Sequence, residues 1–187
     1  MSAKKVLIFS GSTRTGSVNT KLAAVACQAA IDAGADATLI DLTNYPAGIY
    51  NGDEEAASGI PEAIRKLKKQ MAQSDGFVIV TPEYNGHVPP LLGNTFSWAS
   101  RQEQGDQGMV AFAGKKAAIM AASPGKLGGV RVIPRLRDML AELGVMVVPG
   151  FVTLPGAMQA FDDHGQLIDE ANSNAVSGLV QRLIESL

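Results

Sequence analysis

The chain has 187 residues, 46% of them hydrophobic, and a formal net charge of −2, which is the size and composition of a globular protein with a sizeable buried core. This small negative charge argues against a nucleic-acid-binding surface and against a strongly acidic electron carrier that docks on basic partners. The one cysteine, Cys27, excludes an internal disulfide and cysteine-ligated zinc or iron–sulfur centres.

The sequence shows neither a signal peptide nor an apolar stretch of about 20 residues. We therefore expect a single domain over residues 1–187, located in the cytoplasm and without membrane contact. The two histidines, His87 and His164, lie far apart and lack partners at metal-ligand spacing, so no metal site is expected.

Apolar runs alternate with segments of helical periodicity, which is typical of a parallel sheet covered by helices on both faces. The runs predict five strands, near Lys4–Ser10, Asp36–Leu42, Gly76–Thr81, Lys115–Ala122 and Val145–Val148. Apolar residues at helical spacing predict five helices, with apolar faces over Leu22–Ala33, Ile60–Met71, Leu91–Ala99, Val132–Leu143 and Val176–Leu187.

This alternation predicts an α/β fold with a doubly wound parallel sheet, and we expect the flavodoxin-like strand order 2-1-3-4-5. In that order a crevice lies between the first and third strands, at their carboxyl ends. Two long irregular segments, Thr43–Gly59 and Pro149–Asp169, interrupt the alternation. Long segments of this kind tend to carry function or to make contacts.

The loop after the first strand, Gly11–Asn19, reads G-S-T-R-T-G-S-V-N and leads into a helix that begins near Ser17. A helix N-terminus offers unpaired N–H groups and a partial positive charge to an anion. The loop adds short polar side chains and one fixed cation, which come from Ser12, Arg14, Ser17, Asn19 and Thr20. These groups could surround a terminal phosphate on several sides.

Two common phosphate loops do not fit these letters. A Walker A loop needs G-K-[ST], which does not occur in the chain, and a dinucleotide fingerprint needs G-x-G-x-x-G, whereas four residues separate Gly11 from Gly16. Hydroxyls and an arginine suit the dianionic end of a mononucleotide, through charge-assisted hydrogen bonds. The alternative is a capped helix start, with Ser17 or Asn19 as the N-cap and Arg14 on the surface.

A second polar loop, Pro82–His87, follows the third strand and reads P-E-Y-N-G-H. Tyr84 offers an aromatic surface, Asn85 an amide that matches the edge of a heterocycle, and Gly86 a close approach of the backbone. The alternative is a turn that merely ends the strand. Glu83 is expected to place its charge at the N-terminus of the helix that follows, and not to act as a general base.

A third loop, Ser123–Gly129, ends the fourth strand and reads S-P-G-K-L-G-G, with glycines that allow close backbone approach. All three loops fall at the carboxyl edge of the predicted sheet. Together they describe one site with a phosphate pocket, a ring-edge pocket and a glycine-lined wall.

These motifs resemble those of the NAD(P)H-dependent FMN reductase family, which includes flavodoxin-like quinone, chromate and azo-dye reductases. The family's phosphate motif, G-S-x-R-x-x-S-x-N, is present in full over Gly11–Asn19, and its ring motif, P-E-Y-N-G, over Pro82–Gly86. The helix that usually reads L-K-N-A-I-D-W-A-S-R is L-G-N-T-F-S-W-A-S-R over Leu92–Arg101, with Gly93 and Ser97 at the usual Lys and Asp. The resemblance covers most of the chain.

The resemblance implies bound FMN, NADPH or NADH as co-substrate, and an oxidoreductase in which the flavin rather than a protein residue carries the chemistry. A hydride would pass from the nicotinamide to FMN, and electrons would then pass to a quinone, flavin, chromate or azo compound in a ping-pong scheme. The implied cofactor-binding residues are Ser12, Arg14, Ser17 and Asn19 for the phosphate, Pro82, Glu83, Tyr84, Asn85 and Gly86 for the ring, and Ser123, Gly125, Gly128 and Gly129 for the flavin or nicotinamide side.

The resemblance also implies a homodimer or homotetramer. We expect the helix Leu91–Arg101 and the segment Thr43–Gly59 at the subunit contact, where Phe96 and Trp98 are candidates for the interface or for the core. The alternative from a different class is a flavodoxin-like electron carrier or flavin-binding module without nicotinamide turnover. Such carriers typically have a Thr-rich phosphate loop without arginine and a markedly acidic surface. The sequence leaves open the acceptor, the nicotinamide preference and the roles of His87 and of the second irregular segment.

Overall fold

The computed structural model describes residues 2–187 and contains a sheet of strand order β2-β1-β3-β4-β5, with a sixth strand beside β4. The pairings between these strands are parallel. This order confirms the predicted doubly wound, flavodoxin-like arrangement. The strands are β1 Lys5–Ser10, β2 Asp36–Ile40, β3 Gly76–Thr81, β4 Lys116–Ala122, β5 Met146–Val147 and β6 Val152–Leu154.

The sixth strand corrects the sequence analysis, which predicted five. β5 pairs with Lys116 and Ala117 at the start of β4, whereas β6 pairs with the last residues of β4, from Met120 onward. Pro149 and Gly150 lie between the two; proline has no N–H for the ladder, and Gly150 has a φ of +91°. The outer edge of the sheet is therefore a strand interrupted by a bend, and its second half lies in the segment predicted to be irregular.

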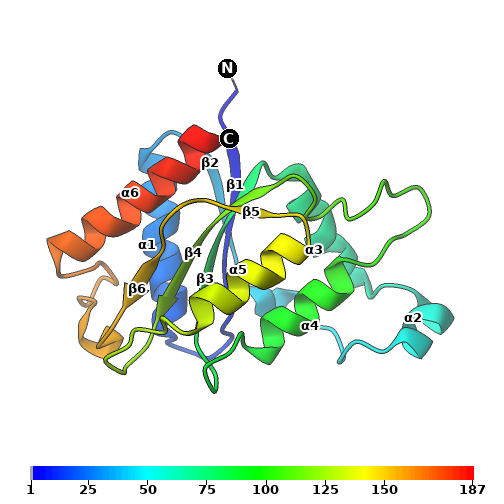
Figure 1. Ribbon diagram of the computed structural model, residues 1–187, viewed down its shortest axis with the longest axis horizontal. Helices are drawn as coiled ribbons and strands as arrows, with labels where there is room; N and C mark the ends of the chain where they lie inside the picture. The colour runs from blue at the N-terminus through cyan, green and yellow to red at the C-terminus, as the bar shows by residue number, and fades with distance from the viewer. Residues whose placement is uncertain (1) are drawn as a thin grey trace.

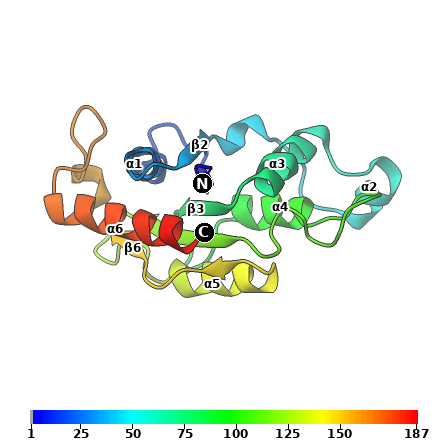
Figure 2. The same cartoon turned by 90° about the horizontal axis from the view of Figure 1, so that it is seen from above.

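Helices cover both faces of the sheet (Figure 1). Figure 2 shows α1 and α6 on one side of the sheet and α3 and α4 on the other, where α5 also packs. The predicted five helices are all present, and a sixth, α2, was missed. The helices are α1 Val18–Asp32, α2 Gly52–Ser58, α3 Glu62–Gln73, α4 Pro90–Ala99, α5 Val132–Glu142 and α6 Glu170–Ser186, with short 3₁₀ turns η1 Leu42–Asn44 and η2 Ala157–Gln159.

The central strands are buried on both faces, which explains their nearly continuous apolar runs. In β1, Ile8 belongs to the core beneath α1 and α6, whereas the next residue, Phe9, belongs to the core on the other face. Phe9 meets Phe96 of α4 edge to face, with ring centroids 6.3 Å apart. This packing fixes the helices relative to the strand ends, where the loops of interest begin.

The loops after β1, β3, β4 and β6 share the carboxyl edge of the sheet, at the bottom of Figure 1, because the strands are parallel. Away from that edge, α2 projects at the outer end of the molecule in Figures 1 and 2 and contains no buried residue. Among residues 2–187, no helix has the length and apolar character needed to cross a membrane.

Candidate functional site

The loop between β1 and α1 turns tightly into the helix. Gly11 is required because a Cβ there would lie 2.7 Å from Cδ1 of Leu92 in α4. Ser17 is the N-cap of α1, and its Oγ accepts a hydrogen bond from the N–H of Asn19 at 3.2 Å. Since Oγ serves there as an acceptor, its O–H remains available as a donor. Capping and anion binding are therefore compatible at this helix start.

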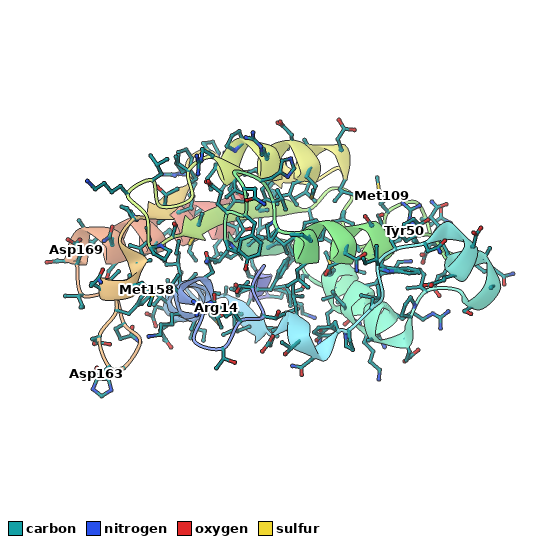
Figure 3. All side chains as sticks on the ribbon, turned by 90° about the horizontal axis from the view of Figure 1, so that it is seen from below. Arg14, Tyr50, Met109, Met158, Asp163 and Asp169 are labelled. Atoms are coloured by element: carbon teal, nitrogen blue, oxygen red, sulfur yellow. The ribbon has the colours of Figure 1, made fainter. Side chains whose placement is uncertain are left out.

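Arg14 supplies an exposed cation on this loop. Among residues 2–187, its guanidinium has one hydrogen bond, from Nη1 to the carbonyl oxygen of Thr15 at 3.5 Å, and no carboxylate partner. Its backbone N–H is 3.4 Å from Oγ of the buried Ser12. Figure 3 shows Arg14 at the carboxyl edge of the sheet. A cation free of acidic partners beside a helix N-terminus is suited to a dianionic phosphate.

Asn19 is buried and joins two of the three loops. Its Nδ2 donates to the carbonyl oxygen of Ala122 at 3.0 Å, and its Oδ1 accepts from the N–H of the same residue at 2.9 Å. The amide thus pairs with the end of β4 as a neighbouring strand would. That Asn19 also contacts a phosphate stays a prediction, and its observed contacts show that it holds the phosphate loop against the end of β4.

The loop after β3 is a tight two-residue turn. Tyr84 and His87 exchange two backbone hydrogen bonds of 3.1 and 2.9 Å. Asn85 and Gly86 between them have φ values of +52° and +72°, as a type I′ turn requires. Asparagine and glycine tolerate this conformation best, which explains their order here. The turn leaves the ring of Tyr84 about half exposed beside the pocket described below.

Glu83 ties this turn to the third loop. Its side chain is only 6% exposed and forms an ion pair with Arg131, the residue before α5. The carboxylate accepts hydrogen bonds from the backbone N–H of Arg131 at 3.0 Å and from its Nε at 2.6 Å. The expectation that the Glu83 carboxylate lies at the N-terminus of α4 was therefore wrong, because it accepts its hydrogen bonds at the N-terminus of α5. The pair fixes the spacing between the loops after β3 and β4.

Gly128 and Gly129 of the third loop are required by packing, whereas a Cβ on Gly125 would meet only Oγ of Ser123, at 3.5 Å. A Cβ on Gly128 would lie 2.8 Å from the backbone nitrogen of Pro155, and a Cβ on Gly129 would lie 2.9 Å from Cβ of Ala121. Both glycines also have positive φ values, +58° and +85°. The loop consequently lies directly against the segment that follows β6.

An open pocket of about 370 Å³ lies where the three loops meet. Its polar side comes from the β1–α1 loop, and its other walls come from the loops after β3, β4 and β6. The structure thus brings together residues that are far apart in the sequence. The predicted site residues that line it are Ser12, Arg14, Ser17, Asn19, Pro82, Glu83, Tyr84 and Ser123.

Asn85 lines a second, shallower hollow of about 660 Å³ together with His87. Glu83 and Tyr84 line both spaces, so the two hollows lie next to each other. The remaining predicted residues line neither space in the described chain. They are Gly86, within the turn, Gly125, at the exposed rim, and Gly128 and Gly129, which are buried.

Four pocket residues were missed by the sequence analysis. Val18 and Pro124 lie inside the motif segments Gly11–Asn19 and Ser123–Gly129, and Ala122 directly precedes Ser123, so taking every residue of these segments and one position more would have found them. Met158 belongs to no motif and lies in η2, within the second irregular segment. Nothing in its sequence surroundings indicated a place at the site.

The aromatic residues considered for a subunit contact lie in the core. Phe96 and Trp98 are both buried. Tyr50 covers Trp98 edge to face at 4.9 Å, and the indole Nε1 donates to the carbonyl oxygen of Gly48 at 2.9 Å. Cys27 is buried as well, and burial raises the pKa of its thiol above the usual range, which disfavours the reactive thiolate.

Comparison with known proteins agrees with this geometry. The family model described as NADPH-dependent FMN reductase matches residues 4–159. An NAD(P)H-dependent FMN reductase from Pseudomonas aeruginosa is 35% identical over 183 residues, covering 96% of this chain and 92% of the relative. A quinone reductase from Escherichia coli K12 is 34% identical over 176 residues, covering 93% and 90%.

A solved structure is also similar along the whole chain. It is FerB, a flavoenzyme NAD(P)H:(acceptor) oxidoreductase from Paracoccus denitrificans, with a TM-score of 0.80 and 28% identity over 98% of this chain and 96% of that one. Sequence, fold and motifs agree in these comparisons. The chain therefore belongs to the NADPH-dependent FMN reductase family and is an oxidoreductase that works with FMN and a reduced nicotinamide.

Proposed function

We propose that the protein holds FMN in the pocket formed by the three loops, oxidises NADPH or NADH, and passes the electrons to a small acceptor in a ping-pong scheme. Quinones, free flavins, chromate and azo compounds are the acceptor classes that suit an open flavin site. One observation carries the proposal: a single pocket joins the free cation of Arg14 to the exposed ring of Tyr84. The names of the relatives, FMN reductase and quinone reductase, support it.

The donor set of the pocket fits FMN. At one end Arg14, Ser12, Ser17 and the first-turn N–H groups of α1 offer positive charge and hydrogen-bond donors to a phosphate. Elsewhere the lining is mostly apolar or aromatic, as a flat heterocycle requires. The phosphate end lacks the glycine spacing of a pyrophosphate loop, which favours FMN over FAD.

When bound, FMN supplies the redox chemistry, by accepting a hydride and returning electrons to an acceptor. The residues of the chain would bind the cofactor and hold it in a fixed orientation. Arg14 and the serines anchor the phosphate, while the Asn19–Ala122 and Glu83–Arg131 contacts fix the distances between the loops.

Anaerobic stopped-flow spectroscopy of the FMN-loaded protein tests the reaction. NADPH or NADH should bleach the flavin band before any acceptor is added, and a quinone should then restore it. Steady-state rates should give parallel double-reciprocal lines. A flavin band that neither nicotinamide bleaches would favour the electron-carrier alternative, and intersecting lines would contradict the ping-pong order.

We further propose a homodimer or homotetramer in which the arm, residues 43–59, contacts a second copy. Ile49 on this arm is 87% exposed, and α2 within it contains no buried residue. The arm is nevertheless held in place, because the N–H of Tyr50 donates to Oδ1 of Asn94 in α4 at 2.8 Å. We place the reaction in the cytoplasm, where reduced nicotinamides are supplied.

A further inference from the structure

The site contains a wall that no sequence motif describes. Met158 lines the same pocket as Arg14, Tyr84 and Ser123, and the residue is 58% exposed. Figure 3, a view of the molecule from below, shows Met158 and Arg14 near each other on different segments. Isolated exposed methionines are ordinary on protein surfaces. What sets this one apart is its place in the lining of the polar pocket.

The backbone under Met158 is fixed to the third loop. The N–H of Ser123 donates to the carbonyl oxygen of Leu154 at 3.1 Å, and the N–H of Ala157 donates to the carbonyl oxygen of Ser123 at 3.1 Å. A third bond, of 3.3 Å, runs from the N–H of Gly156 to the carbonyl oxygen of Gly125. Ala157, next to Met158, is buried in the core beneath α1 and α6. The methionine is therefore presented to the pocket from a firmly held segment.

We infer that Met158 is a flavin-binding residue, whose thioether side chain covers the isoalloxazine–ribityl part of bound FMN from the β6 side of the pocket. This rests on the proposed function. A methionine side chain offers a phosphate no hydrogen bond, whereas its flexible, polarisable thioether packs well on an aromatic ring. Covering the ring removes apolar surface of both partners from water and slows release of the flavin.

The chain offers a matched control in Met146. It is similarly exposed, at 65%, and lies in β5. Its strand partner is Lys116, at the start of β4, whereas β6 pairs with the end of β4 at the site. The same substitution at Met146 shows the effect of losing an exposed methionine away from the site. Any larger effect at Met158 is then due to its place in the pocket lining.

The test measures binding of FMN and of riboflavin to the apoprotein, by quenching of flavin fluorescence, so that it does not depend on enzyme activity. Met158→Ser should raise both dissociation constants about tenfold, because the ring and ribityl chain are common to both ligands. Met158→Leu should stay within about twofold of the unaltered protein, since the apolar volume is conserved. Met146→Ser should change neither constant. Arg14→Ala should weaken FMN and leave riboflavin unchanged, because riboflavin has no phosphate.

The outcomes separate this inference from the proposed function. If the unaltered protein binds FMN and Met158→Ser leaves both constants unchanged, Met158 is no flavin-binding residue while the proposed function stands. A loss confined to FMN would also overturn the assignment, because it would place Met158 at the phosphate. If the unaltered protein quenches no flavin at all, the proposed function fails, and the inference with it.

Discussion

Arg14 is the residue on which the phosphate assignment depends most. Arg14→Ala should weaken FMN binding by about 2–3 kcal/mol, because it removes a charge-assisted partner from a dianion. Titration calorimetry with the apoprotein measures this directly. The melting temperature of the apoprotein should hardly change, since the side chain is exposed and packs against little. Unaltered affinity would return Arg14 to the role of a surface residue beside a capped helix.

Asn85 adopts a left-handed backbone conformation and also places an amide side chain at the site. Asn85→Gly should keep the turn, whereas Asn85→Ala should strain it by roughly 1 kcal/mol because of its positive φ. If the amide contacts the flavin or the substrate, both variants lower kcat/KM. If only the turn matters, the glycine variant retains full activity. Comparison of the two by steady-state kinetics distinguishes these roles.

The residues that the sequence predicted to bind the phosphate do lie together at one pocket, because they belong to one contiguous motif. Ser12, Arg14 and Ser17 fall on one short loop, where letters and spacing are sufficient. The bond partner of Asn19 and the position of Met158 depend on segments that only the folded sheet brings near. No local pattern encodes such contacts.

Between elements, the Asn19–Ala122 contact joins α1 to β4. Asn19→Ala should lower the free energy of unfolding by about 2–3 kcal/mol, because the buried N–H and carbonyl groups of Ala122 lose their partners. Urea unfolding of the apoprotein measures this. Gln28→Ala, on the exposed face of α1, is the control and should stay within about 0.5 kcal/mol. Equal effects of the two substitutions would contradict the bridging role.

A buried lysine holds the segment after α4 to α3. Lys68 pairs with Asp106 and also donates to the carbonyl oxygen of Arg101 at 2.6 Å. The hydrogen bond from Lys68, followed by that from the N–H of Glu103, holds the pKa of Asp106 below its usual 3.8. This carboxylate therefore contributes stability that is fully present above pH 3.8 and is lost as the pH falls through the folded-state pKa.

Asp106→Asn tests this contribution. The variant should be less stable near neutral pH, because the buried ammonium of Lys68 loses its charged partner. As the pH falls below 3.8, its urea midpoint should also fall less than that of the unaltered protein, since this carboxylate no longer titrates. Parallel pH profiles for the two proteins would rule out a role of Asp106 in acid unfolding.

The long helices with apolar faces and the buried strands could be predicted from the sequence, whereas the short elements β6 and α2 could not. β6 has three residues, and its pairing is fixed by the far end of β4. α2 is capped by the side chain of Asn51 and contains no buried residue, so it shows no apolar periodicity. Such elements take their structure from caps and neighbours, which a search for hydrophobic patterns does not detect.

We expect the whole molecule to be a homo-oligomer in solution. Static light scattering at micromolar concentration should give at least twice the chain mass of 19.5 kDa. Ile49→Lys should shift the protein toward the monomer, because it places a charge on the exposed arm, whereas Ile31→Lys, at a half-exposed position in α1, should not. A fully active monomer would remove the proposed contact.

The topology has a consequence for synthesis. The pocket is lined by residues from Ser12 to Met158, and Asn19 needs a partner 103 positions further along the chain. A ribosome delivers the chain from its N-terminus, so the phosphate loop emerges long before the segments that complete its surroundings. A nascent chain that stops before β4 should retain no FMN. Flavin capture should therefore mark the end of folding, and release of stalled chains of increasing length in the presence of FMN would show where along the sequence it begins.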